Sequence, residues 1–134
     1  MTTTLAPIGN ATEPMGLAGA LLESFVRRDY DAMPPLFNPE VHFRALVPPG
    51  LVEGIGPGIV LDRFRTWFGA ADRFEVQDAT VGRLGLRPYL RWRVLVGDAT
   101  VERIAEQHLY LRCSERIDAV DLLCSGFQPV GGEQ

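Results

Sequence analysis

The second half of the chain contains four long β-prone runs, and this feature most restricts the folds that the chain can adopt. Gly85, Gly97-Asp98 and Ser114-Glu115 separate the runs, and such residues are typical of turns between antiparallel strands. The runs are longer than an average strand of about 5–6 residues, so they predict a curled antiparallel sheet. The four runs are Phe74–Leu84, Tyr89–Val96, Val101–Cys113 and Arg116–Phe127.

The first half of the chain has the apolar spacing of helices. In Met15–Arg28, Leu17, Leu21 and Phe25 recur every four residues, which places them on one helical face. Asp31 can cap a short second helix that ends near Phe37. The sequence therefore begins with helices rather than with strands.

A third helix follows a short predicted hairpin. Val41–Val47 alternates apolar and polar residues, and Leu51–Glu53 can pair back on it after Pro48-Pro49-Gly50. Pro57 and Gly58 then open a helix that carries Val60, Phe64 and Trp67 on one side and ends at Gly69. Helices followed by long strands predict one α+β domain over residues 1–134, with a cone-shaped antiparallel sheet wrapped around three helices.

Composition excludes several classes of function. With 46% hydrophobic residues, 22% charged residues and a net charge of −4, the chain has no signature of a nucleic-acid-binding protein. All 13 basic residues are Arg, so Schiff-base chemistry on a lysine is excluded. The absence of Lys also fits a bacterial genome rich in G and C. Two histidines on separate elements give weak support for a metal site, so neither metal nor cofactor is predicted.

Sequence features also predict where the protein resides. No stretch approaches the roughly 20 apolar residues of a membrane span, so no membrane association is predicted. Met1–Glu13 lacks the features of a signal peptide and is predicted to be a flexible lead-in. Two cysteines do not make a disulfide framework, which favours reduced thiols and a cytoplasmic location.

The last two strands suggest a candidate catalytic pair. If they close around Ser114-Glu115, His108 lies directly opposite Asp121, with Glu106 and Tyr110 on the same face. An imidazole next to a carboxylate can transfer protons in general acid–base catalysis. The alternative is a polar cross-strand pair on the surface, and a loop of odd length would turn the two side chains to opposite faces.

The order of elements resembles the nuclear transport factor 2-like superfamily over about residues 15–127. Its most similar segments join the first two helices, enter the first strand, precede the third helix and open the last strand. They are Arg27–Asp31, Phe37–Phe43, Gly54–Gly58 and Glu115–Ile117. The resemblance implies a conical fold with an apolar pocket, and it does not by itself select a reaction.

Within this superfamily, SnoaL-like polyketide cyclases are the branch that the chain resembles most. They place a His on the fifth strand and an acid–base Asp on the last, and His108 and Asp121 match these residue types, with Glu106 in place of a Gln. The Tyr and Asp of isomerase-like sites have no counterparts in the predicted first helix and first strand, and neither Asn of the chain suits an epoxide hydrolase site. If the last strand is instead aligned with the cyclases at Ile117, Leu122 rather than Asp121 falls at the position of their catalytic Asp.

Together these patterns predict a cofactor-independent cyclase, isomerase or dehydratase that acts on a small hydrophobic carbonyl compound. His108 and Asp121 are the predicted catalytic residues. The predicted substrate-binding residues are Glu106, Tyr110, Phe25, Phe64 and Trp67. The alternative is a non-enzymatic domain of the same fold that binds a small molecule or a partner.

The strand alternation further predicts a homodimer. If Glu106, His108 and Tyr110 face the pocket, then an apolar stripe on the neighbouring positions faces outward. The stripe comprises Ala105, Gln107, Leu109, Leu111, Val120 and Leu122. Large exposed apolar patches usually mark interfaces, and pairing of the outer sheet faces would cover this one.

Overall fold

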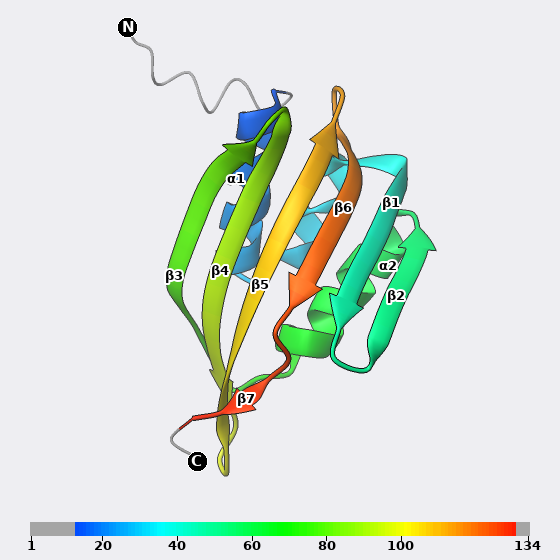
Figure 1. The fold of residues 1–134 in the computed structure, drawn as a ribbon. Coiled ribbons are helices and arrows are strands. Elements are labelled where there is room, and N and C mark those ends of the chain that lie inside the picture. Colours follow the sequence, from blue (N-terminus) through cyan, green and yellow to red (C-terminus); the bar gives the residue numbers. More distant parts are fainter. Residues whose placement is uncertain (1–12, 131–134) are drawn as a thin grey trace, which may run out of the picture.

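The chain forms an open sheet with its helices on one face (Figure 1). This computed structural model describes residues 13–130, so apart from Glu13 the predicted lead-in lies outside the described residues. The helical elements are α1 (Pro14–Val26), the 3-10 turns η3 (Tyr30–Ala32) and η4 (Pro34–Leu36), α2 (Pro57–Phe64) and the π-helical turn η5 (Arg65–Gly69). The strands are β1 (Phe37–Val47), β2 (Gly50–Ile55), β3 (Arg73–Leu84), β4 (Arg87–Gly97), β5 (Glu102–Cys113), β6 (Ile117–Cys124) and β7 (Gln128–Pro129).

The sheet is mixed, which corrects the prediction of a purely antiparallel one. Its strand order is β2-β1-β6-β5-β4-β3, and the short β7 pairs with β5. β3 to β6 form an antiparallel meander, but β6 then lies beside β1 and runs parallel to it. The local turns between the strands predicted their antiparallel pairs, whereas this long-range parallel pair has no turn to reveal it.

The first and third predicted helices form, whereas the second, expected from Asp31 to near Phe37, is replaced by the two 3-10 turns η3 and η4. α1 begins at Pro14, where the missing N–H of proline costs least, and buries Leu17, Leu21 and Phe25. After α1, Arg28 adopts a positive φ of 53°, and its guanidinium donates to the carbonyls of Phe68 and Ala71. This contact fastens the end of α1 to the end of η5. No helix within residues 13–130 is long and apolar enough to cross a membrane.

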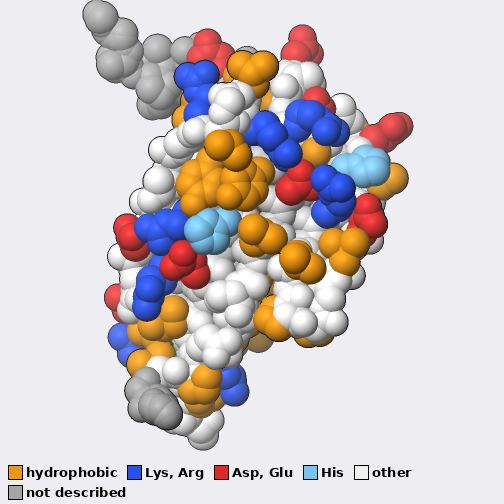
Figure 2. Space-filling model, in the orientation of Figure 1, with side chains coloured by type: hydrophobic (Ala, Val, Ile, Leu, Met, Phe, Trp, Pro, Cys, Tyr) orange, Lys and Arg blue, Asp and Glu red, His pale blue; other side chains and the backbone are white. Residues whose placement is uncertain are grey.

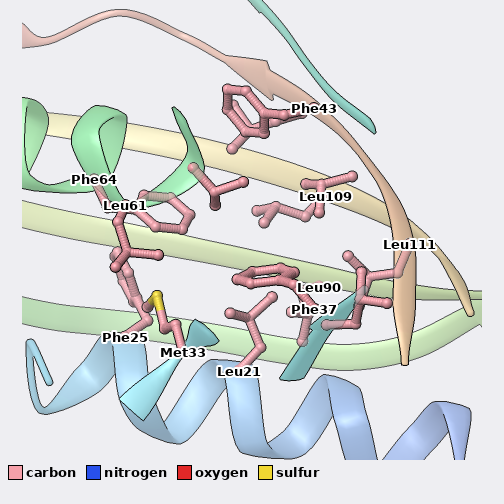
Figure 3. Packing of buried hydrophobic residues seen from close by; sticks show 14 of the residues in the cluster. Leu21, Phe25, Met33, Phe37, Phe43, Leu61, Phe64, Leu90, Leu109 and Leu111 are labelled. Carbon is pink, nitrogen blue, oxygen red and sulfur yellow. The ribbon is translucent and has the colours of Figure 1, made fainter. Parts of the chain in front are cut away.

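Between the helices and the sheet lies a densely packed core (Figure 3). Phe25 stacks on Trp92 with ring centroids 3.7 Å apart and an interplanar angle of 9°. Phe64 and Phe68 meet the edge of Phe25 from α2 and η5. These aromatic side chains fill the space between α1, α2, η5 and the sheet.

The face of β5 that points toward the helices is the opposite of the one predicted. The core-facing side of β5 carries Ala105, Gln107, Leu109 and Leu111, all fully buried. The residues between them, which include His108, are only partly buried and point away from the helices. The apolar stripe therefore packs against the helices inside the protein and is not available as the predicted dimer interface.

Candidate functional site

The β5–β6 register differs from the predicted one by two residues. His108 lies opposite Leu123, and Asp121 lies opposite Tyr110. The predicted direct pairing of His108 with Asp121 is therefore wrong, although both residues stay on one face of the sheet. Because side chains alternate with a period of two, a shift of two residues preserves the face but changes every partner.

Two local features produce this shift. The hairpin tip is a three-residue loop, 114–116, rather than the two-residue turn that the sequence predicted. A bulge follows, since Cys113 pairs with Ile117 but Arg112 pairs with Ala119. The carboxylate of Asp118, at the bulge, accepts hydrogen bonds from the side chains of Asn38 and Ser114. Each feature alone would reverse the faces, and together they restore them.

His108 belongs to a chain of hydrogen bonds on the outer face. Its Nε2 lies 3.0 Å from Oε2 of Glu106, and its Nδ1 lies 2.7 Å from the hydroxyl of Tyr89. A carboxylate only accepts hydrogen bonds. A neutral imidazole therefore donates its Nε2–H to Glu106 and accepts, at Nδ1, a hydrogen bond from the Tyr89 hydroxyl. Burial raises the pKa of Tyr89, which keeps its hydroxyl protonated at neutral pH.

Charged and aromatic neighbours surround this chain of hydrogen bonds. Arg91 and Arg93 approach Glu106 at 3.5 and 3.9 Å, and the ring of Tyr110 lies 5.2 Å from that of Tyr89. Figure 2, which views the sheet face opposite the helices, shows hydrophobic, basic, acidic and histidine side chains mixed on this surface. Glu106 and His108 border an open hollow of about 620 Å³ between β5, β6 and the C-terminal segment.

Asp121 has different partners. Its carboxylate accepts hydrogen bonds from Arg44 at 2.7 Å and from Arg87 at 2.8 Å. Burial by itself raises the pKa of Asp121, but the hydrogen bonds from the two guanidiniums outweigh it and hold the pKa below its usual value. Asp121 is thus an ionised partner of arginines, and its described hydrogen bonds do not include His108.

The predicted substrate-binding residues separate into three locations. Glu106 and Tyr110 lie beside His108 on the outer face. Phe25 and Phe64 have no exposed surface and lie in the packed core. Trp67 lies in η5 at the edge of the core, where its half-buried ring borders a hollow.

That hollow, the end cleft, lies where η5, the β1–β2 turn and the segment after β6 meet. Its volume is about 390 Å³. The lining residues are Val47, Pro48, Pro49, Arg63, Trp67, Cys124, Gly126, Phe127 and Gln128. No carboxylate or imidazole is among them, and Arg63 provides the cation.

Arg63 is held over the indole of Trp67. Its guanidinium carbon lies 5.1 Å from the ring centroid, a cation–π contact. Its Nε is shielded from solvent and has no hydrogen-bond partner among the described residues. The end cleft therefore combines apolar walls with a fixed, incompletely satisfied cation.

Sequence reasoning did not select Arg63, Phe127 or Tyr89 as site residues. Arg63 lies four residues before Trp67 in the chain, and this helical spacing could have indicated a cation–aromatic pair. Tyr89 of β4 reaches His108 diagonally on the neighbouring strand β5, so only the β4–β5 register reveals the contact. Phe127 follows the last long strand and carries no signal that separates it from core residues.

The Cys113 thiol is not a reactive group, and the described residues contain no metal-binding cluster. Burial raises the pKa of Cys113 to about 11, so its thiol stays protonated at neutral pH. Both Cys113 and Cys124 are free thiols. Within residues 13–130 no group of three or more His, Cys, Asp or Glu side chains is placed to hold a metal ion.

Comparison of sequences provides no identification, whereas comparison of structures provides a fold. No protein-family model and no curated protein matches the sequence. A protein from Xanthomonas campestris pv. campestris, provisionally classed as a polyketide cyclase, superimposes with a TM-score of 0.65 at 18% identity, over 85% of this chain and 91% of that one.

Two further structures have the same architecture. A protein from Shewanella putrefaciens, provisionally classed as a SnoaL-like polyketide cyclase, matches with a TM-score of 0.65 at 9% identity, over 93% of this chain and 92% of that one. A ketosteroid isomerase-like protein from Catenulispora acidiphila, in complex with trimethylamine, matches with a TM-score of 0.64 at 13% identity, over 81% and 84% of the two chains. The chain therefore has the nuclear transport factor 2-like fold, which it shares with SnoaL-like polyketide cyclases and ketosteroid isomerase-like proteins.

Proposed function

We propose that the chain binds a small, largely apolar molecule in the end cleft. The observation that carries the proposal is the cleft lining, in which Trp67, Phe127 and Val47 provide apolar walls and Arg63 provides one cation. Small-molecule sites are concave, mostly apolar, about 300–1,000 Å³ in volume and contain few polar groups. At about 390 Å³ the end cleft falls within this range.

Two features favour binding over catalysis in this cleft. Deprotonation next to a carbonyl requires a positioned proton acceptor, and the lining includes neither a carboxylate nor an imidazole. Among the described residues, the buried side chains with polar groups on the inside of the sheet are those of Ser24, Gln107 and Tyr30, and none of them is a carboxylate or an imidazole. Gln107 already accepts a hydrogen bond from Trp92. The end cleft accordingly supports recognition, as in the non-enzymatic alternative from the sequence.

Proton NMR of the two indole N–H groups tests this proposal. Titration with methyl 2-naphthyl ketone, a neutral apolar compound, should shift the signal of Trp67 and leave that of Trp92. The Trp92 N–H is fully buried and bonded to Gln107, so it provides an internal reference. Val47→Phe should fill the cleft and abolish the shift, whereas Val81→Phe on exposed β3 should not. Equal shifts in the wild type and Val47→Phe would contradict binding in this cleft.

A second candidate function is the acid–base reaction that the sequence predicted, now assigned to Tyr89, His108 and Glu106. The order hydroxyl, imidazole, carboxylate is that of a proton relay in which the imidazole takes the proton of the hydroxyl. The Tyr89 oxygen would then act on an activated C–H of a small carbonyl compound. Asp121 would contribute charge to this face through Arg44 and Arg87 rather than move the proton.

Elimination of 5-nitrobenzisoxazole, which needs only a general base, tests this second function without knowledge of the substrate. The wild type should exceed buffer, and His108→Gln and Tyr89→Phe should each lower the excess rate by about 10²–10⁴-fold. The double variant should be little worse than either single variant, because both residues serve one transfer. His42→Gln, an exposed histidine on β1, is the matched control. Unchanged rates in both single variants would contradict the relay.

A further inference from the structure

We infer that the end cleft prefers a ligand whose apolar body carries a carboxylate, and that Arg63 is the residue that selects it. This inference rests on the proposed small-molecule site and adds the charge of the ligand. It starts from the guanidinium of Arg63, which borders the end cleft and whose Nε is shielded from water without a hydrogen-bond partner among the described residues. The terminal nitrogens of Arg63 also have no hydrogen-bond partner among the described residues, so the cation is available to a ligand.

Within the described chain the guanidinium of Arg63 has no carboxylate partner. Several other arginines are paired with a carboxylate, as in Arg44 with Asp121 and Arg65 with Asp31, whereas the exposed Arg83 and Arg112 are, among the described residues, unpaired like Arg63 but lie outside the cleft lining. Arg63 instead lies over the ring of Trp67, and the cleft lining brings it no acidic residue. A carboxylate of a bound molecule would pair with the terminal N–H groups of the guanidinium, which, unlike Nε, are open to solvent.

The surroundings of Arg63 also restrict the shape of the ligand. Trp67 and Phe127 contribute aromatic surface to the lining, and Val47 and Pro48 contribute aliphatic surface. The indole limits the directions from which an acceptor can reach Arg63, because the cation already lies against its face. A flat aromatic or alicyclic carboxylic acid meets both requirements, with its ring against the apolar walls and its carboxylate on Arg63.

A matched pair of ligands separates this inference from the proposed function. Calorimetric titration compares 2-naphthoate with methyl 2-naphthyl ketone, which has the same ring system and no charge. The wild type should bind 2-naphthoate about tenfold more tightly, a typical gain for one charge-assisted hydrogen bond. Arg63→Met should remove this preference, so that the variant binds 2-naphthoate and the ketone with equal affinity. Arg83→Met, at an exposed position on β3, should leave the preference intact.

Each outcome has a distinct meaning. Equal affinity of the wild type for both compounds would overturn the carboxylate preference and leave the proposed function standing. Failure of both compounds to bind would overturn the proposed function and the inference together. A preference that persists in Arg63→Met would assign the charge selection to another residue. Arg63→Lys guards against a folding defect, since it keeps the charge but loses the fork and should retain only part of the preference.

Discussion

The two faces of the sheet differ sharply although they are built from the same strands. On β5 the inward residues Gln107 and Leu109 are completely buried, whereas the outward residues Glu106 and His108 keep about a third of their side-chain surface exposed. The inner face is a continuous apolar core with a single buried amide at its centre. The outer face carries the ionisable groups that the sequence singled out.

This contrast indicates where the chain departs from the expected enzyme pocket. Aromatic side chains of α1, α2 and β4 fill the interior, so stability rather than catalysis accounts for that space. The proposed recognition site lies at the edge of the core, at the end cleft, and the proposed proton relay lies on the outer face. The proposed sites thus lie outside the filled interior of the fold, which agrees with the rule that a fold does not determine an activity.

The largest expected effect comes from the inner face. Phe64 has no exposed surface and contacts the rings of Phe25, Trp67 and Trp92. Phe64→Ala should lower the free energy of unfolding by about 3–5 kcal/mol, through lost burial and the cavity left behind. Denaturant unfolding measures this loss. A loss below about 0.5 kcal/mol, the usual range of surface substitutions, would show that the interior is not packed as described.

A smaller effect is expected at the buried amide of the inner face. Gln107 accepts the N–H of Trp92 at 2.9 Å. Gln107→Met keeps the volume but leaves that N–H without an acceptor, which should cost about 1–3 kcal/mol. Arg112→Met, at an exposed position of the same strand, should change stability by less than about 0.5 kcal/mol. Denaturant unfolding of the two variants compares them, and equal losses would remove the distinction between the faces.

The secondary structure could be predicted because it depends on local patterns. The four-residue spacing of Leu17, Leu21 and Phe25 specified α1, and the glycines between the β-prone runs specified the meander. The parallel pairing of β1 with β6 could not be predicted in this way, since no turn joins these strands. The alternation of polar and apolar residues along a strand also does not show which of its two faces points toward the helices. A strand with polar and apolar faces fits a polar pocket or an apolar core equally well.

The candidate site was predictable only in part for a similar reason. The sequence grouped Glu106, His108 and Tyr110 correctly, because alternate residues of a strand share a face. It misplaced Asp121 because the loop and the bulge at Asp118 shift the register without a residue signature. The contact of Arg63 with Trp67 depends on helical geometry that the apolar spacing did not consider. The face that a residue occupies on its own strand was therefore recoverable, while its exact partner on the next strand was not.

On the outer face, Asp121 should contribute a modest and pH-dependent stabilisation. The pKa of Asp121 is lowered in the folded state by Arg44 and Arg87, so folding is favoured when the carboxylate is ionised. The contribution is complete above the unfolded pKa of about 3.9 and is lost as the pH falls through the lower folded value. Asp121→Asn should thus cost about 1 kcal/mol at pH 7. Unfolding measured from pH 7 down to pH 2 should show the difference shrinking, and a constant difference would contradict the ion pairs.

The smallest effect on stability, with the clearest effect on assembly, is expected where the outer face is apolar. Leu46, Leu51 and Leu123 are 53%, 61% and 45% exposed and border a hollow of about 360 Å³ with Tyr110. Leu46 and Leu51 are cross-strand partners in β1 and β2, so they form one continuous patch. We propose that two copies of the chain pair through this patch, which replaces the stripe that the sequence had assigned to a homodimer.

Leu51→Glu tests the homodimer with little risk to the fold. The side chain is already mostly exposed, so the free energy of unfolding of the monomer should change by less than about 0.5 kcal/mol. Light scattering at micromolar concentration should give a dimer mass for the wild type and a monomer mass for the variant, because pairing would bury the new carboxylates. Leu86→Glu is the control, since Leu86 is 91% exposed in the turn between β3 and β4. A monomeric wild type would contradict the proposed homodimer, because the leucine patch would then be ordinary solvated surface. The outer face would in that case differ from the inner face only in its charged side chains.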